Sequence, residues 1–341
     1  MSFVGAADRS QLRGIDHMTS RTFKQVDVFT SQAYWGNPVA VVLDGTGLSD
    51  SAMQRFACWT QLSETTFVLP PTSQGQAGGA DYRLRIFTPG GELPFAGHPT
   101  LGSARAWLEG GGQTKQEGVI IQECGVGLVR LENQNGRWAF AAPPTQKSAI
   151  PTDKMAVLLS ALGVKEEQVL ASQILNNGPE WWCFLLDSAK TVQNLNPDHL
   201  ALKKSGVKVG VAARIGQQID QDDEPSGSPL LIARSNRESR AFQIAAQRSR
   251  LHSDAAAEPM DLEVRAFAAA MGILEDPVTG SLNASLAQWL FEEKFMPSHY
   301  VAGQGHALDR QGRVHIHQDA SGQVWVGGDT AVCIEGQVAL D

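Results

Sequence analysis

Two short stretches of this chain look like copies of one design, and this repetition constrains the fold more than any other feature. Residues 92–108 read ELPFAGHPTLGSARAWL and residues 275–290 read EDPVTGSLNASLAQWL. Aligned without a gap on Trp107 and Trp289, the stretches place Gly97 opposite Thr279. In each, a glycine-containing turn leads into a helix that is almost free of charge. Helices this apolar on all sides are buried ones, so the sequence predicts a duplicated architecture with one buried helix in each half.

The ends of the two predicted helices suggest a function. Pro99 suits a first helical position and Gly110 suits the residue just past the end of the helix. In the second copy, leucines recur every four residues at 282, 286 and 290. A buried helix still leaves its first N–H groups unpaired, and its dipole makes that end mildly positive. We expect two such ends facing each other to form a dry site for a carboxylate or another small anion.

The overall composition narrows the functional class. The chain has 341 residues, of which 42% are hydrophobic and 19% charged, with a net charge of −8. This size suits two domains, and the negative charge argues against a nucleic-acid partner. No run of 18 apolar residues and no secretory leader is present, so we expect neither a membrane partner nor export, and a cytoplasmic location. The four cysteines are scattered without CxxC spacing, which favours reduced thiols.

Composition changes along the chain suggest its domain boundaries. Residues 1–20 are polar and predict a flexible leader. The segment AAPPT at 141–145 is the best boundary, because two prolines interrupt both strand pairing and helix. We therefore expect an N-terminal domain at 21–142, which the C-terminal residues 331–341 would complete, and a C-terminal domain at 143–330. Each half reads as strands, helix, strands, central helix and strands, which favours an α+β fold over a doubly wound parallel sheet.

Several local expectations follow from hydrophobic periodicity and turn residues. Helices are expected at 48–59 and 155–162 and from residue 196. Strands are expected at 23–30, 39–43, 62–69, 81–88, 119–122, 127–131, 181–186, 230–234, 264–268, 314–318 and 323–327. The glycine-rich segment 74–80 and the acidic segment 217–229 are predicted to be loops.

A series of motifs resembles the phenazine-biosynthesis PhzF-like isomerase family. The motifs are QVDVFT at 25–30, GNP at 36–38, LSETTF at 62–67, FTP at 87–89, ELPFAGHPT at 92–100, EDPVTGS at 275–281 and GG at 327–328. The resemblance covers residues 22–340. It implies the diaminopimelate epimerase-like fold, with two similar domains that each wrap a curved sheet or barrel around a central helix, and an active site in the cleft between them. It also implies a homodimer and no cofactor.

The resemblance assigns catalytic roles to three residues. Glu64 matches the acid/base of the family, and His98 and Asp276 match residues that bind substrate or assist proton transfer. A carboxyl group that moves a proton from carbon needs a raised pKa, which burial beside apolar residues can supply. From the residues alone, alternatives stay open: Glu64 as a surface or strand-capping residue, His98 as a cap-region histidine, and Asp276 as a turn residue before proline.

Four further residues match the substrate-binding positions of the family. The amides near Gly97 and Gly280 match a carboxylate cradle, Ser281 matches a residue that contacts substrate, and Asn37 lies in the turn that borders the cleft. The alternative for Ser281, together with Thr279, is simple capping of the helix.

The chain also departs from its epimerase relatives, which use one cysteine at each helix start. No thiol occurs in 96–98 or 276–281, so two-cysteine epimerisation is not expected. His315 and His317 lie two apart on a predicted strand face, but no third ligand accompanies them, so no metal site is expected.

These features lead to one principal hypothesis and two alternatives. The principal hypothesis is a cofactor-independent isomerase that moves a proton on a small, unsaturated or cyclic carboxylic acid through Glu64. One alternative is a non-catalytic protein that binds small carboxylates on the same fold. The other is a metal-assisted lyase or hydrolase that uses His98 with carboxylates.

Overall fold

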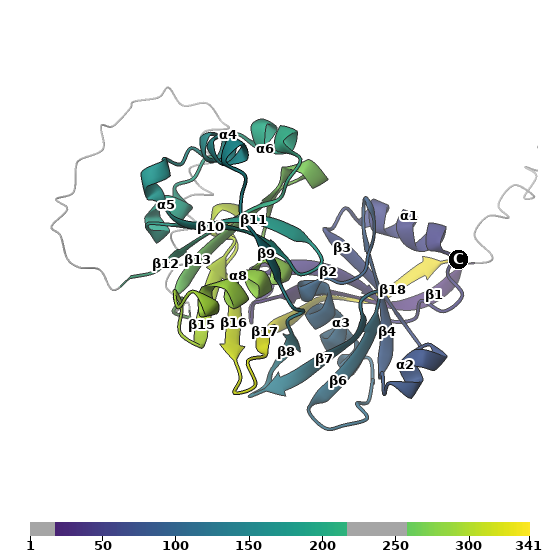
Figure 1. Ribbon diagram of the computed structural model, residues 1–341. Coiled ribbons are helices and arrows are strands. Elements are labelled where there is room, and N and C mark those ends of the chain that lie inside the picture. Colours follow the sequence, from purple (N-terminus) through teal and green to yellow (C-terminus); the bar gives the residue numbers. More distant parts are fainter. Residues whose placement is uncertain (1–17, 217–257) are drawn as a thin grey trace, which may run out of the picture. The chain divides into compact units, whose positions relative to one another are not determined.

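The computed structural model describes residues 18–216 and 258–341, which form two compact units (Figure 1). Unit 1 contains residues 18–34, 38–141 and 329–341, and unit 2 contains residues 35–37, 142–216 and 258–328. The chain passes from unit 1 to unit 2 between Ala141 and Ala142, directly before the two prolines of the predicted boundary. Residues 1–17 of the expected leader lie outside the described residues, as do the expected acidic loop at 217–229 and the expected strand at 230–234.

The strands of unit 1 form a mixed sheet that curves around helix α3 (Gly97–Glu109). Neighbouring strands follow the order β18–β1–β2–β3–β4–β6–β7–β8, with β5 added beside β4. Helix α3 contacts β18 and β1 at one end of this order and β8 at the other, so the sheet wraps around it. The strands are β1 (Thr19–Val28), β2 (Asn37–Val42), β3 (Glu64–Leu69), β4 (Tyr82–Thr88), β5 (Gly91–Leu93), β6 (Val119–Cys124), β7 (Gly127–Gln134), β8 (Arg137–Ala141) and β18 (Thr330–Leu340).

Helix α1 (Asp50–Thr60) packs against β3 and β4 of the same sheet. Its N-cap is Ser49, whose hydroxyl accepts a hydrogen bond from the Ala52 amide at 3.1 Å. Met53 and Phe56 on its buried face join a hydrophobic cluster with Phe67 of β3.

The glycine-rich segment at 74–80 is not wholly a loop, because it contains the short helix α2 (Ser73–Ala77). Thr72 caps this helix by accepting a hydrogen bond from the Gly75 amide at 3.1 Å. The carboxylate of Glu123, on β6, accepts hydrogen bonds from both the amide and the hydroxyl of Thr72. A Cβ atom at Gly75 would lie 2.2 Å from Glu123 Oε2, so this glycine permits the carboxylate to approach. The prediction of a loop over residues 74–80 was wrong for the part that forms α2, because Glu123, which stabilises this helix, lies about fifty positions later in the chain.

Unit 2 repeats the topology of unit 1 around helix α8 (Gly280–Glu292). From β2 to β8, successive neighbours pair parallel, antiparallel, parallel, antiparallel and antiparallel, and the pairs from β11 to β17 follow the same series. The predicted duplication is therefore present at the level of strand pairing. The strands are β9 (Gln146–Ser148), β10 (Val169–Asn176), β11 (Glu180–Leu186), β12 (Val209–Arg214), β13 (Leu262–Ala268), β14 (Ile273–Asp276), β15 (His299–Gln304), β16 (Gly312–Gln318) and β17 (Val324–Gly328).

Among the described residues, helices α4 (Thr152–Leu162), α5 (Ala189–Gln193) and α6 (His199–Ser205) accompany the sheet of unit 2. They share a hydrophobic cluster with the sheet that includes Leu162, Phe184 and Phe267. Beside this cluster, Arg265 forms a doubly hydrogen-bonded ion pair with Glu275, and both side chains are only 5% exposed. No helix among the described residues is long and apolar enough to cross a membrane.

Both central helices approach their strands closely through glycine. A Cβ atom on Gly102 of α3 would lie 2.4 Å from Val39 Cγ1. In unit 2 the glycine is on the strand: a Cβ atom on Gly210 would lie 2.5 Å from Leu282 Cδ1 of α8. These contacts set the distance between each helix and the strands around it.

Candidate functional site

Unit 1 brings together Glu64 and His98, the two residues that the sequence marks most strongly. Glu64 is the first residue of β3, and His98 is the second residue of α3. Their closest atoms, Glu64 Oε2 and His98 Nε2, are 3.4 Å apart, and the side chains are 14% and 5% exposed. Glu64 is therefore not a surface glutamate.

Burial changes the acidity of Glu64. Loss of solvation raises the pKa of its carboxyl from 4.5 to about 7, although a hydrogen bond from the Ser63 side chain acts to lower it. A carboxyl group with this pKa is present in both protonation states near neutral pH. Such a group can accept a proton and return it without a large energetic penalty in either direction.

Hydroxyl groups connect the helix that carries His98 to the strand that carries Glu64. Thr66, two residues after Glu64 on β3, forms a hydrogen bond with Ser103 of α3 at 2.8 Å between the hydroxyl oxygens. The Thr66 hydroxyl also lies 3.2 Å from the carbonyl oxygen of Ala40 on β2. All three residues are buried, so these contacts fix α3 against β3 close in sequence to Glu64 and His98.

Unit 2 brings together Asn37 and Asp276. Asp276 ends β14, and its Oδ1 accepts a hydrogen bond from Asn37 Nδ2 at 2.9 Å while its Oδ2 accepts one from the Thr279 hydroxyl at 2.8 Å. Asn37 is 1% exposed and also donates to the carbonyl oxygen of Val278 at 2.8 Å. Asp276 is therefore held at both oxygens.

The buried amide of Gln304, which the sequence analysis missed, fixes this turn to β15. Its Nε2 donates to the Asp276 carbonyl at 3.0 Å and to the Thr279 hydroxyl at 2.9 Å. Its Oε1 accepts from the Thr279 amide at 3.0 Å and from Asn283 Nδ2 at 2.9 Å. A single glutamine at a strand end has no distinctive pattern, and only the expectation that buried backbone groups find partners pointed to such a residue.

Helix α8 begins at Gly280, one residue later than the gap-free alignment with α3 places it. Its N-cap, Thr279, makes no side-chain capping bond, because the hydroxyl donates to Asp276 instead. Ser281 Oγ accepts a hydrogen bond from the indole of Trp181 at 3.3 Å. The capping interpretation of these two residues was wrong. Helix α3 likewise begins at Gly97 without a side-chain cap.

His315, His317 and the cysteines have contacts apart from the residues described above. His315 Nε2 is 3.2 Å from Glu258 Oε2, whereas the ring of His317 stacks between those of His299 and Trp325, with centroids 5.4 Å and 6.3 Å away. The four cysteines, at 58, 124, 183 and 333, form no disulfide, which agrees with the expected reduced thiols.

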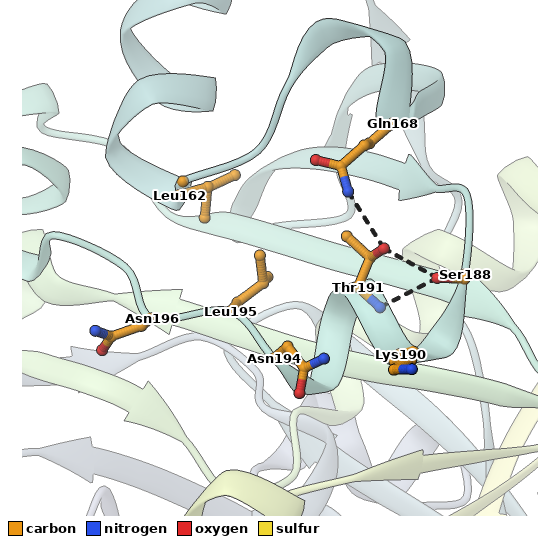
Figure 2. A pocket seen from close by; sticks show the side chains of 9 residues that line it. Leu162, Gln168, Ser188, Lys190, Thr191, Asn194, Leu195 and Asn196 are labelled. Atoms are coloured by element: carbon orange, nitrogen blue, oxygen red, sulfur yellow. Dashed lines mark hydrogen bonds between the residues drawn. The ribbon is translucent and has the colours of Figure 1, made fainter. Parts of the chain in front are cut away.

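A cavity of about 450 Å³ with a mixed polar and apolar lining opens in unit 2, and Figure 2 shows the residues around it. Thr191 accepts a hydrogen bond from Gln168 Nε2 at 3.4 Å and shares one with Ser188 at 2.9 Å. The cavity is lined by Leu162, Gly163, Gln168, Ser188, Lys190, Thr191, Asn194, Leu195 and Asn196. None of the site residues predicted from the sequence is among them.

Comparisons with known proteins cover almost the whole chain. The model of the family described as "Phenazine biosynthesis-like protein" (PhzC-PhzF) matches residues 26–224 and 242–336. Antisense-enhancing sequence 1 of Schizosaccharomyces pombe is 34% identical over 335 residues, which cover 94% of this chain and 99% of that protein. Trans-2,3-dihydro-3-hydroxyanthranilate isomerase of Pseudomonas aeruginosa is 31% identical over 326 residues, which cover 92% of this chain and 98% of that protein.

Solved structures confirm the predicted diaminopimelate epimerase-like α+β fold. A PhzF-family protein of Bacillus anthracis superposes with a TM-score of 0.71 at 21% identity, covering 94% of this chain and 99% of that one. A hydroxyproline epimerase of Agrobacterium vitis superposes with a TM-score of 0.51 at 13% identity, covering 94% and 93%. With a family model matched along most of its length and full-length relatives that are named isomerases, this chain is an isomerase and belongs to the PhzC/PhzF phenazine biosynthesis-like family.

Proposed function

We propose that the chain catalyses cofactor-independent transfer of a proton between carbon atoms of a small, unsaturated or cyclic carboxylic acid, with Glu64 as the acid/base. The observation that supports this most directly is the buried Glu64 carboxyl, whose pKa of about 7 suits proton exchange at neutral pH. The substrate class is supported by the P. aeruginosa relative, whose name describes a cyclic, unsaturated amino acid.

The proposed reaction needs no oxidant or second substrate. The Glu64 carboxylate takes a proton from one carbon, and the C–H electron pair shifts into the adjacent π system. The resulting carboxylic acid returns the proton to a carbon two positions away on the same face, so one C–H bond breaks, another forms and the double bond moves. His98, 3.4 Å from Glu64, donates a hydrogen bond to the substrate or relays the proton. Since no cysteine occurs at the start of α3 or α8, the proposed route does not use paired thiols.

The proposal also gives the remaining predicted residues a role in binding. The uncapped first turns of α3, at Gly97, and α8, at Gly280, suit a carboxylate, because unpaired amides and the helix dipole both favour an anion. Ser281 contributes a hydroxyl there. Asp276, oriented by Asn37, accepts a hydrogen bond from a substrate hydroxyl or amine.

Deuterium incorporation from heavy water tests this function. Wild type and Glu64→Gln are incubated with a panel of unsaturated and amino carboxylic acids, and uptake is followed by mass spectrometry. We expect wild type to exchange at least one acid. Glu64→Gln should bind the same acid, but its rate of deuterium exchange should fall by at least about a hundredfold, as expected for loss of a general base. Glu117→Gln, an exposed site in the same unit, should match wild type. If acids that bind show no exchange, the protein binds small carboxylates without turnover and the proposal fails.

A further inference from the structure

We infer that Lys208 is a ligand-binding residue, which pairs with the anionic group of the substrate at the first turn of α8 while Trp181 holds its ammonium group in place. The inference deepens the proposed function, since it rests on a carboxylic acid as the ligand. The inference concerns unit 2 alone. It gives the ligand a charged contact in addition to the backbone amides at the first turn of α8.

The sheet register directs Lys208 towards the start of α8. A Cβ atom at Gly210 would meet Leu282 of α8 at 2.5 Å and Cys183 Sγ at 3.3 Å, so the face that carries Gly210 and Cys183 is turned towards α8. Side chains alternate along extended backbone, which places Trp181, on β11, and Lys208, the residue just before β12, on this same face. The parallel pairing of β11 with β12 keeps them adjacent, and the Trp182 amide donates to the Lys208 carbonyl at 2.9 Å.

Side-chain contacts connect the Lys208 ammonium to the first turn of α8. Its Nζ lies 5.0 Å from the centroid of the Trp181 ring, which is within the range of a cation–π interaction. The indole N–H of Trp181 donates to Ser281 Oγ at 3.3 Å. Trp181 is only 3% exposed, so the surface on which the ammonium rests is rigid.

The electrostatic surroundings of this lysine favour an anion. Glu180 and Asp276 act on Lys208 through their charges, and both favour its charged form. Partial burial lowers the pKa of the ammonium, which reflects the loss of its hydration. A cation near the positive end of a helix is unfavourable. The Asp276 carboxylate, which acts on Lys208 from a distance, already accepts hydrogen bonds from Asn37 Nδ2 and from the Thr279 hydroxyl. A bound carboxylate would give the ammonium a direct partner at this end of α8.

Equilibrium binding of two ring compounds of almost equal shape tests the inference. The probes are anthranilate and its neutral amide, 2-aminobenzamide, measured by titration calorimetry at low salt. Wild type should bind anthranilate more tightly than the amide. Lys208→Met should weaken anthranilate binding about tenfold or more, the effect of one charge-assisted hydrogen bond, and leave the amide affinity unchanged. Lys208→Arg should keep most of the preference, and Lys204→Met, an exposed site on α6, should behave as wild type.

Three outcomes would overturn the inference. Equal losses for both probes in Lys208→Met would assign this lysine a packing role over Trp181. An unchanged anthranilate affinity would show that the ammonium does not reach the ligand. If wild type binds anthranilate no better than 2-aminobenzamide, the electrostatic potential at the first turn of α8 does not select an anion. These measurements need no turnover, so loss of Glu64-dependent isotope exchange would refute the proposed function and leave this result standing.

Discussion

Replacing Glu64 with glutamine should stabilise the protein at neutral pH, because the wild-type carboxyl is held where ionisation is costly. The pKa of Glu64 rises from 4.5 to about 7 on burial, so between these values the folded state binds more protons than the unfolded state. Stability contributed by the protonated carboxyl is therefore lost as the pH rises through this window. At 1.36 kcal/mol for each pKa unit, the loss reaches about 3 kcal/mol above pH 7. The side chain is only 14% exposed, which leaves little solvent screening.

Urea denaturation from about pH 4 to about pH 8 measures this effect as a difference between variants. The free energy of unfolding of Glu64→Gln minus that of wild type should grow by about 3 kcal/mol between pH 4.5 and pH 7 and stay constant above. Glu117→Gln, which changes an exposed carboxyl, should give a difference that varies little over this range. A difference that shrinks with rising pH would refute the reasoning, because it would mean that a protonated His98 keeps Glu64 ionised in the folded protein.

Three other substitutions test the packing and the polar contacts around the site. Gln304→Leu should lower the free energy of unfolding by at least about 2 kcal/mol in urea titrations, because it leaves buried donors unpaired. It should also slow isotope exchange; an unchanged exchange rate would show that the turn from Asp276 to Thr279 does not need the hydrogen bonds of Gln304. Glu275→Gln should cost about 3–5 kcal/mol by the same measurement, since Arg265 would keep a buried, unpaired charge; a loss near zero would contradict this. Gly102→Ala should lower the melting temperature through overlap with Val39, and the additional change Val39→Ala should restore part of the loss; no recovery would place the strain elsewhere.

The central helices could be predicted because their signals are local. A nearly uncharged run acts within one helix, and α3 and α8 cover the predicted segments. Gly110 follows the last residue of α3 as predicted, but Pro99 is the third residue of α3 and not the first, because the helix begins at Gly97. Among the described residues, the strands that were not predicted are β5, β8, β9, β10, β12, β14, β15 and β18. Strand β18 shows why: its residues are mostly exposed or half-buried, and its position depends on β1, about three hundred residues earlier.

The residues of the candidate site also fall into those that local motifs mark and those that only the folded structure reveals. Short motifs mark Glu64, His98 and Asp276, so the sequence alone could nominate these residues. Gln304 and Lys208 carry no motif, and their relevance appears only in the folded sheet. The strand register aligns Asp276 with Ala266 and Ala266 with Gly210, which places residues from distant parts of the chain in one row. The functional roles of the nominated residues stay predictions that the isotope-exchange and binding experiments test.

The repeated topology has a consequence for how such an enzyme diversifies. The two halves share the same strand pairing, yet the polar residues at the two helix starts differ. In unit 1 a glutamate and a histidine share a dry environment, whereas in unit 2 a glutamine anchors a turn beside a lysine on an indole ring. Under the proposed function, substitutions in unit 2 can retune ligand choice while the burial that sets the acidity of Glu64 is preserved. New substrate preferences can then evolve without rebuilding the proton-transfer chemistry.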